Sequence, residues 1–124
     1  MAYVDTSCAV AIAFGERSAG GIARKLGAFD ELVASNLLEA ELLATFARER
    51  VEPDAAVVSA FAWIIPDRPL HAEVRRVLDA GCVRGAGCWH LATALYVADD
   101  PAEMAFLTLD ARQAKVARTL GFAG

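Results

Sequence analysis

Short apolar runs alternate with stretches of helical periodicity along the whole chain, and this alternation constrains the fold more than any other feature of the sequence. The predicted strands are Ala2–Val4, Glu31–Ala34 and Met104–Leu109, each followed by polar residues that begin a helical stretch. Strands separated by helices pair into a parallel sheet, with right-handed crossovers that cover both faces. We therefore expect a three-layer α/β/α fold with a central parallel sheet.

Helix signals fill the segments between the strands. Pro53 ends one helix, Gly81 and Gly121 close two others, and the stretch Ala86–Ala98 is apolar nearly all round, which indicates a helix buried against the sheet. Helices are predicted after Asp5-Thr6-Ser7 and at Ser18–Ala28, Leu37–Arg50, Asp54–Trp63, Leu70–Ala80, Ala86–Ala98 and Ala111–Leu120.

Length and composition predict one globular domain over residues 1–124, because domains run about 100 to 200 residues. A hydrophobic content of 56% and a charged content of 23% exclude a disordered chain. The longest apolar run, Cys8–Phe14, is far shorter than the roughly 18 to 20 residues of a membrane span. Asp5 stands where a signal peptide would be apolar. We expect a cytoplasmic protein without a membrane partner.

Cysteine usage and net charge narrow the function classes. Cys8, Cys82 and Cys88 show no metal-binding spacing, so we expect each to be a reduced, buried thiol. The formal net charge of −4 argues against binding of nucleic acid by a broad basic face. A nuclease stays open, because an acidic site that binds divalent cations brings its own positive charge to a phosphate.

Acidic residues stand at the ends of two predicted strands, Asp5 after the first and Asp110 after the last. Ligands of parallel sheets bind outside these carboxyl ends. An Asp before a helix is also a favoured N-cap, and Asp110 with Gln113 fits a capping box, so both interpretations stay open. A third carboxylate, Glu41, lies at the edge of the buried stripe of Leu37–Arg50, where a charge is costly unless something neutralises it.

Carboxylates gathered at one edge of a sheet repel one another unless a cation lies between them. Mg²⁺ and Mn²⁺ prefer oxygen ligands and keep several waters, so Asp5, Glu41 and Asp110 can hold such an ion beside a phosphate. The ion polarises a phosphoryl oxygen and activates a water for phosphodiester hydrolysis. We therefore predict these three residues as metal ligands and catalytic residues, and we assign Glu39 to a capping box with Asn36.

Four segments carry a family resemblance that covers nearly the whole chain: Tyr3–Ser7, Ala34–Leu42, Arg84–Leu95 and Phe106–Asp110. In this order and spacing the sequence resembles a PIN domain, specifically the toxin of a VapBC-type toxin–antitoxin pair. The resemblance implies a PIN-like fold, an Mg²⁺- or Mn²⁺-dependent endoribonuclease, a homodimer, and a cognate antitoxin whose C-terminal segment lies across the active-site groove. It places Asp5, Glu41 and Asp110 at metal-binding positions of the family.

One position departs from the family pattern. The family usually has an acidic residue three positions before the His of the His-Leu-Ala-Thr-Ala stretch, and here that residue is Gly87, three before His90. Asp99 and Asp100 lie about 18 Å away along the helix, and Cys88 is too soft a ligand for Mg²⁺. His90 is a conceivable Mn²⁺ ligand, but a hydrogen-bonded core histidine is the commoner case. We expect weaker metal binding and reduced activity.

Two alternatives to an active ribonuclease stay open. A catalytically degenerate PIN domain would bind RNA or an antitoxin without cleavage. The other alternative is a phosphatase with Asp5 as nucleophile. Phosphatases of the haloacid-dehalogenase type have the pattern Asp-x-Asp-x-Thr, and this chain has Ser7 in place of the second Asp. The receiver-domain pattern does not fit either. The candidates for contacts with the RNA backbone are Thr6, Arg84, Arg112 and Lys115. Thr6 could instead be a helix cap, and Arg84 could be a solvated surface side chain.

Overall fold

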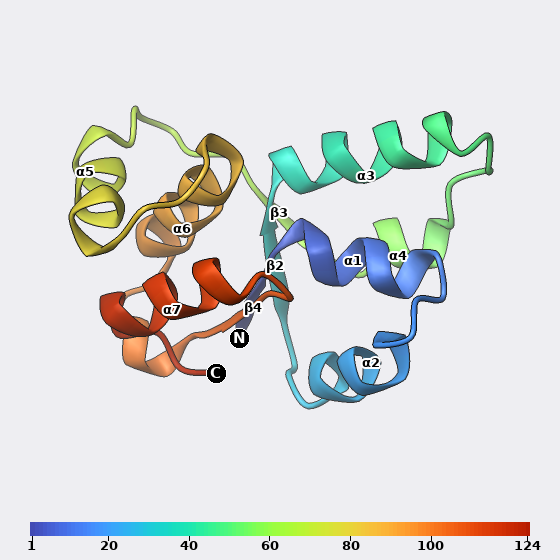
Figure 1. Ribbon diagram of the computed structural model, residues 1–124, viewed down its shortest axis with the longest axis horizontal. Helices are drawn as coiled ribbons and strands as arrows, with labels where there is room; N and C mark the ends of the chain where they lie inside the picture. The colour runs from blue at the N-terminus through green and yellow to red at the C-terminus, as the bar shows by residue number, and fades with distance from the viewer.

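A four-stranded sheet, parallel throughout, lies at the centre of the computed structural model, which describes all 124 residues. Its strand order is β3-β2-β1-β4. The helices α1 to α4 cover one face and α5 to α7 the other (Figure 1). The predicted three-layer α/β/α arrangement is thus confirmed. The strands are β1 Ala2–Val4, β2 Leu32–Ser35, β3 Ala62–Ile64 and β4 Ala105–Leu107.

Seven α-helices connect and cover the strands. Gly121 ends the last one in the left-handed conformation, with φ 99°, which a glycine adopts without strain. None of the helices has the length and hydrophobicity that crossing a bilayer requires. The helices are α1 Thr6–Ala13, α2 Ala19–Gly27, α3 Asn36–Arg48, α4 Ala55–Val58, α5 His71–Ala80, α6 Gly85–Val97 and α7 Ala111–Leu120, with a 3₁₀ turn at Pro101–Glu103.

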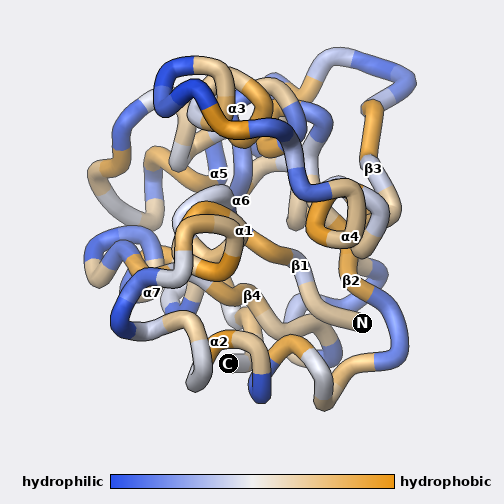
Figure 2. Tube along the Cα trace, turned by 90° about the vertical axis from the view of Figure 1, so that its right-hand side faces the viewer, coloured by the Kyte–Doolittle hydropathy of each residue, from blue (hydrophilic) through white to orange (hydrophobic).

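The sheet separates two hydrophobic cores, because successive residues of a strand point to opposite faces. Tyr3 of β1 faces α5 to α7 and stacks on Phe106 of β4, with ring centroids 5.3 Å apart. Val4 faces the other core, where Leu38 and Leu42 of α3 are fully buried. In Figure 2 hydrophobic segments concentrate around β1 and β4, and hydrophilic segments lie in the outer loops.

The segment Asp54–Trp63 differs from its prediction as one helix. Helix α4 ends at Val58, and the chain then forms β3, in which Ala62 pairs with Val33 and Trp63 with Ala34. The β-branched residues at the end of α4 favour the helix only weakly. Pairing with β2 satisfies the backbone groups of Ala62–Ile64, and such long-range pairing leaves no local signal in the sequence.

Two residues that follow α5 can be compared with their predictions. Gly81 ends α5 as expected, with an extended φ of 172°. A Cβ there would lie 2.7 Å from Cγ2 of Val116, so close packing of α7 excludes a side chain at this position. Cys82 is exposed, whereas Cys8 and Cys88 are buried free thiols as expected.

The order of the strands creates a switch point between β1 and β4. From β1 the chain moves to β2 and β3 on one side, and it returns to place β4 on the other side of β1. Connections that diverge in this way open a crevice at the carboxyl ends of the two strands, where parallel sheets bind ligands. Asp5 directly follows β1 and Asp110 begins the helix after β4, so both stand at this crevice.

Candidate active site

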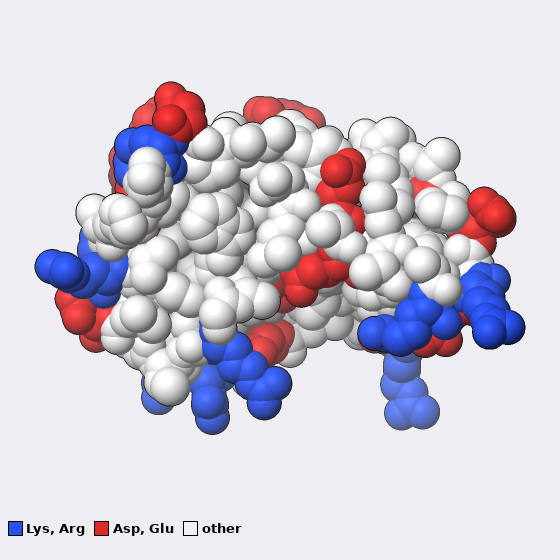
Figure 3. Space-filling view, turned by 90° about the horizontal axis from the view of Figure 1, so that it is seen from above, with Lys and Arg blue, Asp and Glu red and all other residues white.

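A polar pocket of about 640 Å³ opens at the carboxyl ends of β1 and β4. Asp5, Glu41 and Asp110 line it, and no other acidic residue does. Figure 3 looks onto this end of the sheet: acidic side chains gather near the middle of the face, and Lys and Arg lie toward its edges. Three carboxylates from distant parts of the sequence therefore line one pocket.

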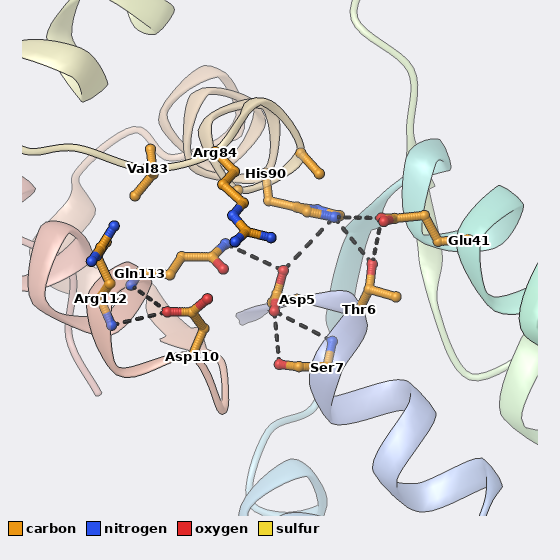
Figure 4. A pocket seen from close by; sticks show the side chains of 12 residues that line it. Asp5, Thr6, Ser7, Glu41, Val83, Arg84, His90, Asp110, Arg112 and Gln113 are labelled. Atoms are coloured by element: carbon orange, nitrogen blue, oxygen red, sulfur yellow. Dashed lines mark hydrogen bonds and ion pairs between the residues drawn. The ribbon is translucent and has the colours of Figure 1, made fainter.

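Asp5 is buried and held by donors from three parts of the chain, of which Figure 4 shows Ser7 and Gln113. Its Oδ2 accepts hydrogen bonds from the backbone N–H and the hydroxyl of Ser7, at 3.3 and 2.7 Å, and from the hydroxyl of Thr108 at 2.9 Å. Its Oδ1 accepts one from the side-chain amide of Gln113 at 3.2 Å. These donors compensate the charge of the buried carboxylate. Asp5 also caps α1.

Glu41 lies in the second turn of α3 with its side chain 35% exposed. Its Oε1 accepts a hydrogen bond of 2.8 Å from the Thr6 hydroxyl and lies 3.1 Å from Nε2 of His90. The same Nε2 is 3.7 Å from Oδ1 of Asp5, so the His90 ring stands between two carboxylates. His90 is 1% exposed, and the prediction of a hydrogen-bonded core histidine is confirmed.

Asp110 is exposed and caps α7, with its Oδ1 accepting from the backbone N–H groups of Arg112 at 2.9 Å and Gln113 at 3.1 Å. The capping interpretation of Asp110 is thus confirmed. The predicted capping box is wrong in its other hydrogen bond, from the Gln113 side chain back to Asp110, because the Gln113 side chain turns to Asp5 instead. The predicted capping box of Asn36 and Glu39 is also wrong, because the N-cap of α3 is Ser35, whose side chain accepts from the backbone N–H of Leu37 at 3.0 Å.

No three Asp, Glu, His or Cys side chains lie close enough together to hold a metal ion as they stand. The donor chemistry still fits a hard divalent cation, because three carboxylates face one polar pocket. The hydrogen bonds of Glu41 end on Oε1 and those of Asp110 on Oδ1, which leaves Oε2 and Oδ2 for other partners. An ion shared with Asp5 therefore requires these side chains to turn.

Gly87 lines the same pocket from the first turn of α6. A Cβ there would lie 3.6 Å from Cδ and Oε1 of Gln113 and 3.8 Å from Cβ of Val83, which is ordinary van der Waals contact. The backbone therefore has room for a side chain that points toward Gln113. Asp99 and Asp100 follow the far end of α6 and do not replace the missing carboxylate.

The predicted RNA-contact residues fall into two groups. Thr6, Arg84 and Arg112 line the pocket, although the Thr6 hydroxyl is engaged by Glu41. Lys115 is exposed and lines a separate groove beside Cys82. The positive charge at the pocket itself thus comes from two arginines, which enter from the starts of α6 and α7 (Figure 4).

Sequence reasoning missed three polar partners of Asp5: Ser7, Thr108 and Gln113. The sequence indicates a capping role for Gln113 and does not mark Ser7 or Thr108 as partners of Asp5. One signal was available, because polar residues that follow two strands of a parallel sheet meet at the same edge. The amide of Gln113 left no such signal, since its direction depends on the space beside Gly87.

The fold and the pocket define a class of protein: a parallel α/β domain with carboxylates at its topological switch point. A comparison with models of protein families matches residues 2–119 to the PIN domain, and the chain belongs to this family. PIN domains are generally nucleases, which supports a hydrolase role of this kind. Searches of the curated proteins and of the solved structures found no match.

Proposed function

We propose that this protein is an endoribonuclease that hydrolyses RNA phosphodiesters with a divalent cation, Mg²⁺ or Mn²⁺. The observation that carries the proposal is the gathering of Asp5, Glu41 and Asp110 in one pocket at the switch point of a PIN fold. These three residues would hold the ion, which would polarise a phosphate oxygen and lower the pKa of a bound water.

Two cationic side chains at the pocket support a phosphate substrate. Arg84 and Arg112 line it together with the three carboxylates. A guanidinium group matches the geometry of a phosphate oxygen pair and orients the backbone without reading its sequence. Since the whole chain carries a formal net charge of −4, attraction to RNA would depend on this pocket rather than on a basic surface.

We expect the activity to be reduced, because Gly87 contributes no carboxylate. The biological role we propose is that of the toxin of a type II toxin–antitoxin pair. Its homodimer would act in the cytoplasm, and a cognate antitoxin would cover the pocket. The supporting observations are the motif resemblance and the family membership.

A catalytically degenerate PIN domain that binds RNA or an antitoxin is the second candidate. Gly87 and the lack of a ready-made cluster of three metal ligands favour it. Binding would use the same pocket and the same two arginines, without hydrolysis.

Cleavage of a structured RNA in Mn²⁺ separates the two candidates. Glu41→Gln removes one pocket charge while keeping an oxygen for Thr6 and His90. Glu39→Gln is the matched control, because Glu39 lies on the same helix outside the pocket. A ribonuclease loses cleavage with a chelator and in Glu41→Gln, and keeps it in Glu39→Gln. RNA binding without cleavage in every variant, Gly87→Asp included, would establish the binding module instead.

A further inference from the structure

A buried chain of hydrogen bonds joins three layers of the protein behind the pocket. The backbone N–H of Ser35 donates to Oη of Tyr3 at 3.2 Å, and the same Oη lies 2.9 Å from Nδ1 of His90. On the other side of the ring, Nε2 lies 3.1 Å from Oε1 of Glu41. Tyr3 and His90 are 0% and 1% exposed, so water does not compete for the contact between them.

The Tyr3 end of this chain determines where the imidazole carries its proton. Oη of Tyr3 already accepts from the N–H of Ser35, and the hydroxyl has one proton to donate. The acceptor in reach of that proton is Nδ1 of His90. A nitrogen that accepts a hydrogen bond carries no hydrogen, so the neutral ring has its proton on Nε2.

The Glu41 end requires the same tautomer. A carboxylate oxygen only accepts, so the contact of 3.1 Å between Nε2 and Oε1 is a hydrogen bond when Nε2 carries the proton. The Thr6 hydroxyl donates to the same oxygen and, through its own lone pair, can share the Nε2 proton at 3.1 Å. Both ends of the ring therefore favour the form protonated on Nε2.

We propose that Tyr3 and His90 are positioning residues: Tyr3 fixes the tautomer of His90, and the Nε2–H of His90 holds Oε1 of Glu41, which leaves Oε2 to turn toward an ion. A Glu side chain with one third of its surface exposed otherwise samples several rotamers. Groups that orient a metal ligand in this way raise its affinity for the ion. This last consequence rests on the proposed function, whereas the tautomer of His90 does not.

The tautomer is measured by ¹⁵N NMR of the imidazole nitrogens. The chain has two histidines, and His71 is exposed, so a His71→Asn variant leaves His90 as the one signal. In the neutral form of the ring, the expected spectrum has hydrogen on Nε2 alone. In Tyr3→Phe, which keeps the ring stacked on Phe106, the tautomers become mixed. Hydrogen on Nδ1 in the wild type, or an unchanged spectrum in Tyr3→Phe, would overturn the assignment.

The positioning of Glu41 is measured by titration with Mn²⁺ alone, without RNA. His90→Gln keeps an amide N–H near the place of Nε2, and His90→Asn is too short to reach Glu41. We expect His90→Asn to lower the Mn²⁺ affinity about 10-fold, Tyr3→Phe to lower it less, and His90→Gln to restore most of the loss. In a Glu41→Gln background, His90→Asn should change the affinity no further.

Three results would contradict the positioning role. Equal losses in His90→Gln and His90→Asn, or a loss that persists in the Glu41→Gln background, would make the His90 contact merely structural. Because His90 is buried, thermal unfolding of each variant is recorded alongside, and Tyr3→Phe carries the test if His90→Asn does not fold. A wild type that binds no Mn²⁺ would refute the metal site and the positioning of its ligand, and would leave the tautomer standing.

Discussion

The side-chain amide of Gln113 donates a hydrogen bond of 3.2 Å to Oδ1 of Asp5, and both residues are buried. A Cβ added to Gly87 would lie 3.6 Å from both Cδ and Oε1 of Gln113. A neutral amide thus occupies the side of Asp5 toward which a residue-87 carboxylate would extend. No second negative charge therefore repels the Asp5 carboxylate on this side, and hydrogen-bond donors stabilise it.

Replacing Gln113 by Leu tests this relationship. The volume is similar and the helix propensity is kept, but Oδ1 of Asp5 loses its amide donor. We expect the free energy of unfolding to fall by about 1 to 3 kcal/mol, since a buried charged acceptor loses its partner. Urea denaturation measures the change. Lys115→Leu on the exposed side of α7 is the control and should shift stability by about 0.5 kcal/mol or less. Equal stabilities of the two variants would contradict a role for the amide.

Gly87→Asp should restore the missing carboxylate, because its Cβ meets only ordinary contacts. We expect it to raise both the Mn²⁺ affinity and the rate of RNA cleavage above the wild type. Gly87→Asn is the matched control: it makes the same change in backbone freedom, worth about 0.5 to 1 kcal/mol in a helix, without the charge. Calorimetric titration and a cleavage assay compare the three proteins. Equal affinity and activity in Gly87→Asp and the wild type would refute the vacant-ligand interpretation.

The layered fold could be predicted because its signals are local. The apolar stripe of α3 and the continuous apolarity of α6 lie within single helices, and both helices occur where expected. Strand β3 could not be predicted in this way. Its three residues pair with β2, some thirty positions earlier in the chain, and their own sequence, Ala62–Ile64, does not distinguish a strand from the end of a helix.

The charged residues of the candidate site could be predicted from the sequence, but the hydrogen bonds that they form could not. Asp5 and Asp110 follow strands, and Glu41 is an isolated charge beside buried leucines, so each stood out in the sequence. Their partners depend on where side chains from distant elements point. His90 reaches Glu41 because α6 and α3 both contact β2, and nothing in the sequence measures the separation of 3.1 Å between Nε2 and Oε1.

Asp110 allows the capping role and the metal role to be separated. Asn caps a helix about as well as Asp, so Asp110→Asn should keep the stability of the wild type, and Asp110→Ala should lose about 1 kcal/mol. If the charge serves a cation, both variants lose Mn²⁺ affinity to a similar extent. Thermal unfolding and Mn²⁺ titration give the two readouts. An Asp110→Asn protein with wild-type Mn²⁺ affinity would reduce Asp110 to a helix cap.

Acid should remove the contribution of the ion pair between Arg68, in the loop after β3, and Glu73 in α5. The two terminal guanidinium nitrogens of Arg68 contact Glu73 in α5, with Nη1 at 3.0 Å from Oε1 and Nη2 at 2.6 Å from Oε2. Hydrogen bonding from Arg68 holds the pKa of Glu73 below its usual value. A carboxyl whose pKa is lower in the folded state stabilises the protein above the unfolded value of about 4.3, and this stability is lost as the pH falls through the folded value.

Glu73→Gln should therefore lower the Tm at pH 7. The difference in Tm from the wild type should disappear as the pH falls below the pKa of Glu73 in the unfolded state and then through its lower pKa in the folded state. We expect a shift of no more than a few degrees, because the Arg68 side chain is half exposed and solvent screens the pair. Melting curves between neutral and acidic pH measure it, with Glu31→Gln as the control at an exposed carboxylate. A difference in Tm that stays constant over this range would show that Glu73 stabilises the fold by packing rather than by its charge.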